Sequence, residues 1–538
     1  MSFINSLALA ALFTLSHSRA TSGILTDPSG TCTSLLTSLS SLPNSTIHFA
    51  QYLPAGTNIS LPQDYDLASC GFASQVINVD LCRVAMEVKT SERSAITLEA
   101  WLPGTEWTGR FLSTGNGGLS GCIQYRDMAY ASGLGFATVG TNNGHNGTRG
   151  IAFGNNPDVV HDFSDRSMHT GVVIGKQITE KYYGCAHKKS YYLGCSSGGR
   201  QGFKAVQSYP EDFDGVVAGA PAFNFVNLSG WSALFYTLFG NDTSDPRFVT
   251  ADQWAEVVHP EVLNQCDGID GVVDGVIEDP ELCRFRPEAL LCAPNAGNTT
   301  ACLRKEQVES LRAVYTDYYG VDGKLIYARM QPGSELLARF VYYTTGAFQY
   351  SIDWYRYVVY NDTTWDPATY TIQDAKVAND QNPFNIATWD GDISAFQNAG
   401  GKLLHYHGLM DAIITSENSP VYYNLVSRTM GLNSSQLDDF YRFFRVAGMG
   451  HCTGGDGAFM IGNQAAGFTS TEPQKNVLMR MVDWVENGNA PETITGVKYV
   501  DNDKTKGVDV VRNHCKYPKR NTCVDPANYK KPEAWTCV

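Results

Sequence analysis

The sequence predicts an α/β fold in which one sheet domain is interrupted by a long insertion. From about residue 93 to 224, apolar strand-like runs alternate with glycine-rich turns and helical segments. From 225 to 390 this alternation stops, and the chain becomes irregular and rich in aromatic residues, Asp and Asn. Beyond 400 the alternation resumes. We therefore expect residues 21–224 and 391–538 to form the sheet domain and residues 225–390 to form an inserted lid domain.

The expected elements follow one another in the order of an α/β sheet. A helix with 3.6-residue periodicity is predicted over 165–183, and another near 416–430. The run FDGVVAGAPAF is apolar throughout, which is typical of a parallel strand buried on both faces. The remaining segments are AITLEAWLP, GRFLSTG, GFATVGT, KSYYLG, GGKLLHYHGLMDAII and FYRFFRVAGMGHC as strands, and RQGFKAVQSYP and QKNVLMRMVDWVENG as helices.

The N-terminus and the composition indicate a secreted protein. Residues 1–20 carry a short apolar run that ends in small residues, which is the pattern of a cleaved signal peptide, and no stretch has the ~20 apolar residues of a membrane span. Fourteen cysteines and several N-x-[ST] triplets suit an oxidising secretory route. A net charge of −14 argues against nucleic acid or an anionic membrane as a partner.

The segment GCSSG places Ser196 between a predicted strand and a predicted helix. A G-x-S-x-G turn in that context is the nucleophile elbow of an α/β-hydrolase fold, in which glycines permit the strained backbone that exposes the serine hydroxyl. Ser197 is the competing serine, but it lacks the paired glycines and is better placed to offer its backbone N–H to an oxyanion hole. Cys195 as a thiolate nucleophile is disfavoured by the even cysteine count of a secreted chain.

A serine hydroxyl needs an imidazole to take its proton and a carboxylate to hold that imidazole's tautomer. In the α/β-hydrolase order the acid and the histidine follow the serine, each on a loop after a later strand. Asp411 follows the strand in HYHGLMDAII, and His451 follows the strand in RVAGMGHC. The alternative interpretation is structural: Asp411 would be a turn or helix-cap carboxylate, and His451 a loop histidine with a backbone partner. His405 and His407 form an H-x-H within an apolar strand and are interpreted as structural.

The second donor of an oxyanion hole usually comes from a glycine-rich loop after an earlier strand. FLSTGNGGLSGC supplies such a loop, and Gly118 is the candidate donor, although a plain hairpin turn would have the same composition. Cys195 precedes the proposed nucleophile and Cys452 follows the proposed base. If Ser196 and His451 are in contact, the two cysteines can come close enough for a disulfide that pins the histidine loop to the elbow.

The segments GCSSGGRQG, YHGLMD and GMGHC resemble those of the fungal tannase and feruloyl esterase family, and the similarity runs over nearly the whole mature chain. The resemblance implies that Ser196, Asp411 and His451 are catalytic and that Cys195 pairs with Cys452. Tannases tend to have an acidic residue after the nucleophile, whereas this chain has Ser197. The feruloyl esterase B branch is therefore the more similar one.

An acidic, glycine-rich loop lies between Cys266 and Cys283. Glycine-bent acidic loops can supply the oxygen ligands that Ca²⁺ prefers, but the spacing is not that of an EF-hand, and a solvated acidic turn is nearly as good an interpretation. The resemblance implies a structural calcium site in the lid. Its ligands would be the side chains of Asp267, Asp270 and Asp274 and the carbonyls of Val272 and Val276.

Spacing together with the resemblance implies further disulfides and an activity. The expected pairs are Cys32 with Cys82, Cys70 with Cys122, Cys266 with Cys283, Cys292 with Cys302 and Cys515 with Cys537, which leaves Cys185 and Cys523 as a remaining candidate pair. The expected activity is that of a secreted serine esterase acting on hydroxycinnamate esters of plant cell-wall sugars, with the aromatic tract 340–365 over the pocket. The alternatives are a tannase of the same family and a calcium-dependent binding protein on a degenerate hydrolase scaffold.

Overall fold

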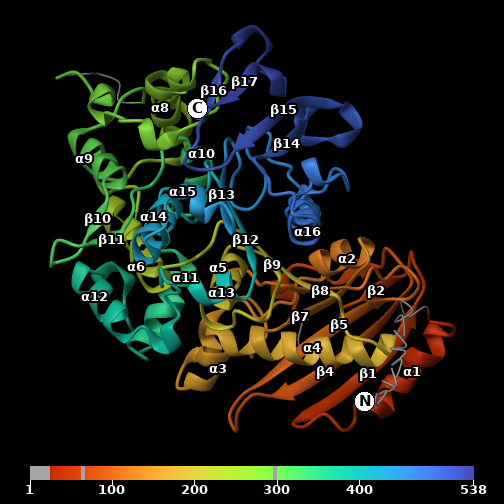
Figure 1. Ribbon diagram of the computed structural model, residues 1–538. Helices are drawn as coiled ribbons and strands as arrows, with labels where there is room; N and C mark the ends of the chain where they lie inside the picture. The colour runs from red at the N-terminus through yellow and green to blue at the C-terminus, as the bar shows by residue number, and fades with distance from the viewer. Residues whose placement is uncertain (1–24, 62–66, 241, 295–299) are drawn as a thin grey trace, which may run out of the picture.

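The computed structural model describes residues 25–61, 67–240, 242–294 and 300–538 (Figure 1). Its centre is a nine-stranded mixed sheet in the order β1-β4-β5-β7-β6-β8-β9-β12-β13. The strands from β1 to β7 pair antiparallel, and those from β7 to β13 pair parallel. The bounds are β1 Ser45–Leu53, β4 Leu81–Lys89, β5 Ala95–Pro103, β6 Arg110–Thr114, β7 Phe136–Thr141, β8 Lys189–Cys195, β9 Gly215–Gly219, β12 Lys402–Gly408 and β13 Tyr441–Val446.

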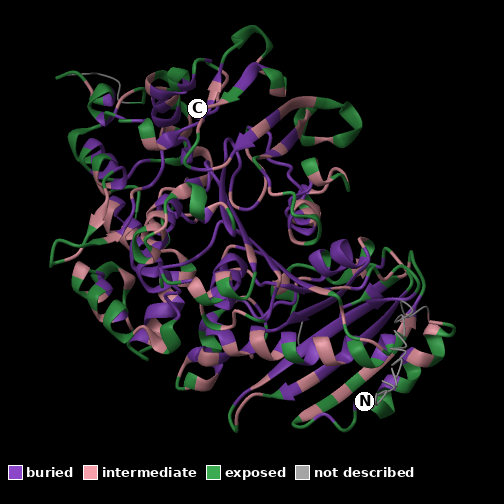
Figure 2. Ribbon diagram, in the orientation of Figure 1, coloured by how far each residue is buried: buried purple, intermediate pink, exposed green. Residues whose placement is uncertain are grey.

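Helices cover both faces of the sheet. On β8 and β9, Tyr192 and Val216 belong to the core on one face, whereas their neighbours Tyr191 and Val217 belong to the core on the other. Because successive side chains of a strand point to opposite faces, strands buried on both sides read as continuous apolar runs. Figure 2 shows the central strands buried and the exposed residues on the outer helices. The helices on one face are α1 Pro28–Ser38, α4 Ser167–Tyr183, α5 Ser197–Ser208 and α14 Asn418–Met430, and those on the other are α2 Tyr125–Gly133 and α16 Val477–Asn487.

Residues 225–390 contain more helix than the prediction of an irregular segment allows. The first helix, α6 (Phe225–Phe239), is apolar on nearly every face and therefore lacks the amphipathic periodicity by which a helix is recognised. Within the described residues this insertion adds no strand to the nine-stranded sheet, and its aromatic side chains form a core of their own. In Figure 1 it lies on the left, away from the antiparallel strands. Its other longer helices are α8 His259–Cys266, α9 Lys305–Val314 and α12 Ile372–Gln381, and β10 Tyr318–Tyr319 pairs with β11 Leu325–Tyr327.

The two ends of the chain add structure that the sequence did not predict. Strands β1 and β4 extend the sheet at its antiparallel edge, and the C-terminal region forms small two-stranded sheets. These are β14 Thr493–Tyr499 with β15 Val508–Cys515, and β16 Asn521–Cys523 with β17 Trp535–Cys537. The predicted signal peptide, residues 1–20, lies outside the described residues. In the part of the chain that is described, no helix has the length and apolarity to cross a bilayer.

The parallel part of the sheet determines where loops gather. Strands β6, β8, β12 and β13 all run in the same direction. The loops that follow them therefore leave from the same edge, which is where open α/β sheets place their ligands.

Candidate active site

The turn between β8 and α5 holds Ser196 in a backbone conformation that few residues adopt. Its φ is 66° and its ψ is −125°, and such a conformation costs on the order of 1–3 kcal/mol. The Ser196 N–H donates to the carbonyl of Gly219 at 3.0 Å, and the Ala222 N–H donates to the carbonyl of Ser196 at 3.0 Å. The neighbouring strand β9 and the residues after it therefore support a turn with the geometry of a nucleophile elbow.

Both glycines of the GCSSG turn are required for space. A Cβ at Gly194 would lie 2.7 Å from the carbonyl oxygen of Gly198. A Cβ at Gly198 would lie 2.9 Å from the carbonyl oxygen of Asn116, in the loop after β6. Both contacts are with backbone atoms, so larger side chains at these positions would displace the turn or the loop.

His451, in the loop after β13, contacts the buried carboxylate of Asp411, in the loop after β12. His451 Nδ1 donates to Asp411 Oδ2 at 2.8 Å. Asp411 Oδ1 accepts from the N–H groups of Ile413 at 2.8 Å and Ile414 at 3.0 Å. Burial alone would raise the pKa of Asp411, but the charge of His451 and hydrogen bonds from His407 and His451 outweigh it and hold this pKa well below its ordinary value. The carboxylate is therefore ionised and leaves His451 Nε2 as the nitrogen that can accept a proton.

Ser196 and His451 line one cavity of ≈ 380 Å³ at the carboxyl ends of the strands. His451 retains 20% of its side-chain exposure, whereas Asp411 has none. The hydrogen bonds of the described residues include none between Ser196 Oγ and His451, and catalytic contacts of this kind commonly tighten when substrate binds. The nucleophile and base predicted from the sequence thus face the same space, with the predicted acid behind the base.

Gly118 and Ser197, the two predicted oxyanion donors, line the same cavity. Ser197 is the first residue of α5, so its N–H has no partner within the helix. Its Oγ donates to the Gly118 carbonyl at 2.6 Å and joins the two loops. Gly118 has a φ of 56°, and a Cβ there would lie 2.5 Å from the ring of Tyr350. Only glycine fits this position without displacing the insertion.

The predicted disulfide between Cys195 and Cys452 is confirmed, with the two Cα atoms 6.0 Å apart. It joins the residue before Ser196 to the residue after His451. Cys452 has a φ of 64°, so the histidine loop is itself held in an unusual conformation. The other five predicted pairs are also present: Cys32–Cys82, Cys70–Cys122, Cys266–Cys283, Cys292–Cys302 and Cys515–Cys537.

The remaining candidate pair is wrong, because Cys185 and Cys523 are both free thiols. Cys185 lies between α4 and β8, whereas Cys523 is buried in β16 beside the acidic loop of the insertion. Pairing the two leftover cysteines assumed that an even count means complete pairing. The fold places them on different elements instead.

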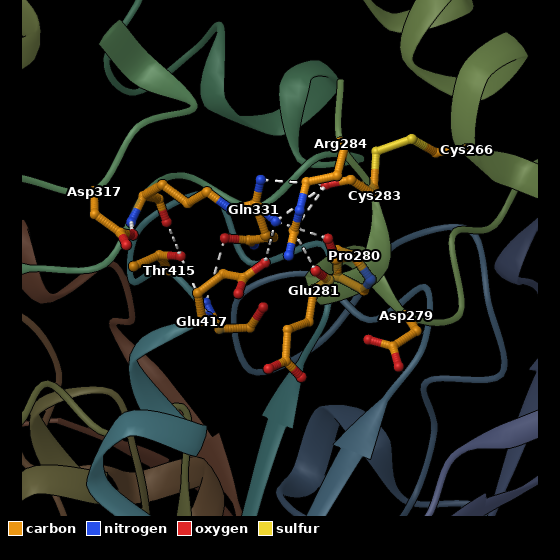
Figure 3. A network of polar contacts seen from close by, with 12 residues as sticks. Cys266, Asp279, Pro280, Glu281, Cys283, Arg284, Asp317, Gln331, Thr415 and Glu417 are labelled. Atoms are coloured by element: carbon orange, nitrogen blue, oxygen red, sulfur yellow. Dashed lines mark hydrogen bonds and ion pairs between the residues drawn. A yellow bond between two sulfur atoms is a disulfide. The ribbon is translucent and has the colours of Figure 1, made fainter. Parts of the chain in front are cut away.

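Hydrogen bonds and an ion pair join the loop that carries Asp411 to the insertion (Figure 3). Gln331 donates through Nε2 to the Asp411 carbonyl at 2.5 Å and accepts through Oε1 from the Ser416 N–H at 3.3 Å. Thr415 donates to the Arg329 carbonyl, and Arg329 forms an ion pair with Glu417. Burial raises the pKa of Glu417 to about 7, against the lowering effect of Arg329. No local sequence pattern indicates these contacts, which join segments about 85 residues apart.

His407 also contacts the carboxylate of Asp411, although the sequence interpretation treated it as structural. Its Nε2 lies 3.2 Å from Asp411 Oδ2, the oxygen that also receives the His451 N–H. His405, the other member of the H-x-H, bonds to Tyr441 and Ser419 and does not reach the carboxylate. A histidine four residues before the acid, in a strand of otherwise mainly apolar residues, is the signal that could have identified His407.

The acidic loop after α8 is folded around its own backbone. Asp267 accepts from the N–H groups of Asp274 and Gly275, and Asp274 also pairs with Arg512 of β15 at 2.9 Å. Asp270 Oδ1 accepts from the Val272 N–H, while its Oδ2 is buried with no hydrogen-bond partner in the described part of the molecule. Burial raises the pKa of Asp270 to about 6. An unpartnered carboxylate oxygen of this kind suits a cation.

Side chains alone do not form a metal site in this loop. Among the described residues, no group of three or more His, Cys, Asp or Glu side chains converges closely enough to hold a metal ion. A calcium ion would therefore need backbone carbonyls as well as carboxylates. Val276 of this loop packs against Leu409 and Ala447, which precede Asp411 and His451 by two and four residues. The acidic loop thus lies against the beginnings of the loops that carry Asp411 and His451.

Comparison with known proteins agrees with this geometry. The family model described as "Tannase and feruloyl esterase" matches residues 82–538. A protein of Neosartorya fischeri called probable feruloyl esterase B-2 is 56% identical over 497 residues, which cover 92% of this chain and 93% of that protein. The crystal structure of feruloyl esterase B from Aspergillus oryzae is 52% identical and superposes with a TM-score of 0.91, covering 95% of this chain and 100% of that one. A tannin acyl hydrolase from Aspergillus niger, at 22% identity and a TM-score of 0.75 over 95% and 94% of the two chains, shares the fold.

Proposed function

The chain belongs to the tannase and feruloyl esterase family, and from this premise we propose that it is a feruloyl esterase that works through a serine acyl-enzyme. The observation that carries the proposal is the strained Ser196 beside the His451–Asp411 pair in one cavity. A carboxylic ester hydrolase needs these groups and no organic cofactor.

Each residue has one task in the reaction. Ser196 Oγ attacks the ester carbonyl while His451 Nε2 takes its proton, and the N–H groups of Ser197 and Gly118 stabilise the oxyanion. The C–O bond to the alcohol breaks, and His451 returns the proton to the leaving oxygen. Water, deprotonated by His451, then attacks the acyl-enzyme and releases the acid and free Ser196. Asp411 stays ionised and stabilises the imidazolium throughout.

Ser196→Ala should abolish release of ferulate from methyl ferulate, because the acyl-enzyme cannot form. Ser208→Ala is the matched control, since it removes a serine hydroxyl from the exposed far end of the same helix, α5. We expect the control to retain most of its turnover. Turnover by a folded Ser196→Ala protein would refute the assignment, and a wild-type protein that fails to react with a fluorophosphonate probe would favour a binding protein.

Both apolar and polar side chains line the cavity, which supports an aromatic acyl group and a sugar alcohol. Phe225, Leu228 and Phe348 of the insertion supply apolar surface, and Ser229 and Ser232 of the same segment supply hydroxyl groups. The sheet domain adds Asp127 and Gln464, where Gln464 Nε2 donates to Asp127 at 3.0 Å. A planar hydroxycinnamoyl group is expected against the apolar side chains, because aromatic surface is best buried there. The alcohol of a plant cell-wall polysaccharide is expected against the polar ones.

Galloyl esters are the alternative substrates within the family. The high identity to proteins named feruloyl esterase makes them the less supported alternative. We expect kcat/KM for methyl ferulate to exceed that for methyl gallate. A reversed preference would identify the protein as a tannase.

The same proposal extends to the architecture and the destination of the protein. Residues 21–224 and 391–538 are proposed as an α/β-hydrolase domain and residues 225–390 as its lid domain. Support for the lid comes from Phe348 and Tyr350, which line the cavity. Support for secretion comes from the six disulfides and from the signal-like residues 1–20.

We further propose that the acidic loop binds a structural calcium ion through Asp267, Asp270, Asp274 and the carbonyls of Val272 and Val276. The buried, unpartnered Oδ2 of Asp270 supports this proposal. Val276 contacts Leu409 and Ala447, so an ion bound here would also stabilise the loops that carry Asp411 and His451.

Calcium removal should therefore lower stability before it affects chemistry. EDTA dialysis should lower the Tm, and added Ca²⁺ but not Mg²⁺ should restore it, since Mg²⁺ demands a tighter octahedral shell. Asp270→Asn should lose the response to Ca²⁺. A Tm that is insensitive to EDTA and Ca²⁺ would refute the site.

A further inference from the structure

Behind the triad, a line of buried hydrogen bonds runs from β13 to the catalytic carboxylate. Tyr441 OH lies 3.0 Å from His405 Nδ1, and His405 Nε2 lies 3.0 Å from Ser419 Oγ. Ser419 Oγ lies 2.6 Å from His407 Nδ1, and His407 Nε2 lies 3.2 Å from Asp411 Oδ2. All five side chains are fully buried.

The position of one proton in this line is determined by the chemistry of its neighbours. His407 Nε2 also lies 3.1 Å from the carbonyl oxygen of Ile414. A carbonyl can only accept a hydrogen bond, so His407 Nε2 carries a proton in either charge state of the ring. That N–H is shared between the Ile414 carbonyl and Asp411 Oδ2. Ser419 at the other nitrogen holds the ring in this orientation.

Asp411 therefore has every position around its carboxylate occupied. Oδ1 accepts two backbone N–H groups, and Oδ2 accepts one N–H from His407 and one from His451. Hydrogen bonds to a carboxylate spread its charge and lower its basicity. The hydrogen bond from His407 reduces the negative charge on Oδ2, and Oδ2 therefore stabilises the imidazolium that forms on His451 less strongly.

We propose that His407 is a positioning residue for the esterase, which fixes the orientation of Asp411 and shares its Oδ2 with the base His451. This inference rests on the proposed function, because it assigns His451 as the base of that reaction. His407 touches neither the substrate nor the reacting atoms, and it acts through Asp411.

The described titratable groups around His407 differ in whether they titrate near neutral pH. Burial lowers the pKa of His405 well below its ordinary value. Burial raises the pKa values of Tyr327 and Tyr342 of the insertion, and of Tyr441 of β13, far above theirs. The pKa of Asp411 lies well below its ordinary value, whereas burial raises that of Glu417, two residues before Ser419, to about 7. The pH profiles are therefore compared in a Glu417→Gln background, in which this carboxyl group does not titrate.

The experiment compares two amides at one position. The glutamine amide of His407→Gln reaches the place of Nε2 and can donate to Asp411, whereas the shorter amide of His407→Asn reaches the place of Nδ1 and contacts Ser419. The measurement is the rate at which a fluorophosphonate probe labels Ser196 as a function of pH, and the acid limb is the low-pH part of that profile, where the rate rises with pH. In His407→Asn the acid limb should move to higher pH by at least about half a unit. His407→Gln should stay within about 0.2 units of the wild type.

His514→Asn is the matched control, because it makes the same change at an equally buried histidine that lies outside this line of hydrogen bonds and bonds the Ala458 carbonyl. It should lose stability and keep the acid limb. An unmoved limb in His407→Asn, or an equal shift in His514→Asn, would overturn the proposal. Failure to cleave methyl ferulate would count against the proposed function. The role of His407 would still be tested by the acid limb of the labelling profile, because labelling does not depend on the natural ester.

Discussion

Removing the disulfide beside the triad should cost both stability and activity. Replacing Cys195 and Cys452 together by alanine opens a covalent loop with a sequence separation of 257, whereas replacing Cys292 and Cys302 opens one with a separation of 10. In the chain-entropy description, the free energy of unfolding falls by about 5.5 kcal/mol for the first loop and about 2.7 kcal/mol for the second. The second pair lies in the insertion and is the control.

Activity should separate the two variants more sharply than stability does. The first bridge joins the neighbours of Ser196 and His451, and a misplacement of about 1 Å between reacting groups can lower the rate about 100-fold. Guanidinium unfolding gives the stabilities, and kcat/KM on methyl ferulate is measured where near-UV circular dichroism shows each variant folded. Activity of the Cys195/Cys452 variant within about threefold of the wild type would refute a positioning role. Equal losses of stability in the two variants would refute the reasoning from loop length.

Three further predictions concern Glu417, Asn227 and Gly118. Burial raises the pKa of Glu417 to about 7 in the folded state. Between about pH 4.5 and 7 the folded chain therefore binds more protons at this carboxyl group than the unfolded chain does, and the free energy of unfolding should fall as pH rises through this range. Glu417→Gln should reduce this pH dependence in urea unfolding measurements. Asn227 is 9% exposed and donates to two other amides, so glycopeptide mapping should find it unmodified while the exposed Asn58 carries glycan. Gly118→Ala should lower kcat about 100-fold with little change in KM, and adding Tyr350→Ala should not restore it, because the φ of 56° remains.

Local patterns predicted the sheet core well. The strand, turn and helix around Ser196, the strands before Asp411 and His451, and helix α16 all lie where periodicity and glycine spacing placed them. These elements are buried on both faces or amphipathic, so neighbouring residues carry the information. Six disulfides followed from spacing and family resemblance together.

Other features depend on residues far apart in the chain. Helix α6 is enclosed by the insertion's own core and has no polar face to mark its period. Cys185 and Cys523 are separated by tertiary placement, which counting cannot reveal. His407 acquires its role only because α14 and the loop after β12 bring Ser419 and Asp411 to its two nitrogens.

The contacts of Gln331 and Arg329 with the acid loop bear on how this enzyme can be engineered. Exchanging residues 225–390 for the corresponding segment of a relative would be the obvious way to transplant substrate preference. Because that segment also supports the backbone of Asp411, a graft must bring matching partners for residues 411 to 417 or it will impair the chemistry along with the selectivity. Point changes at Phe225, Leu228 or Phe348 leave the support in place and are the safer route to a new acyl specificity.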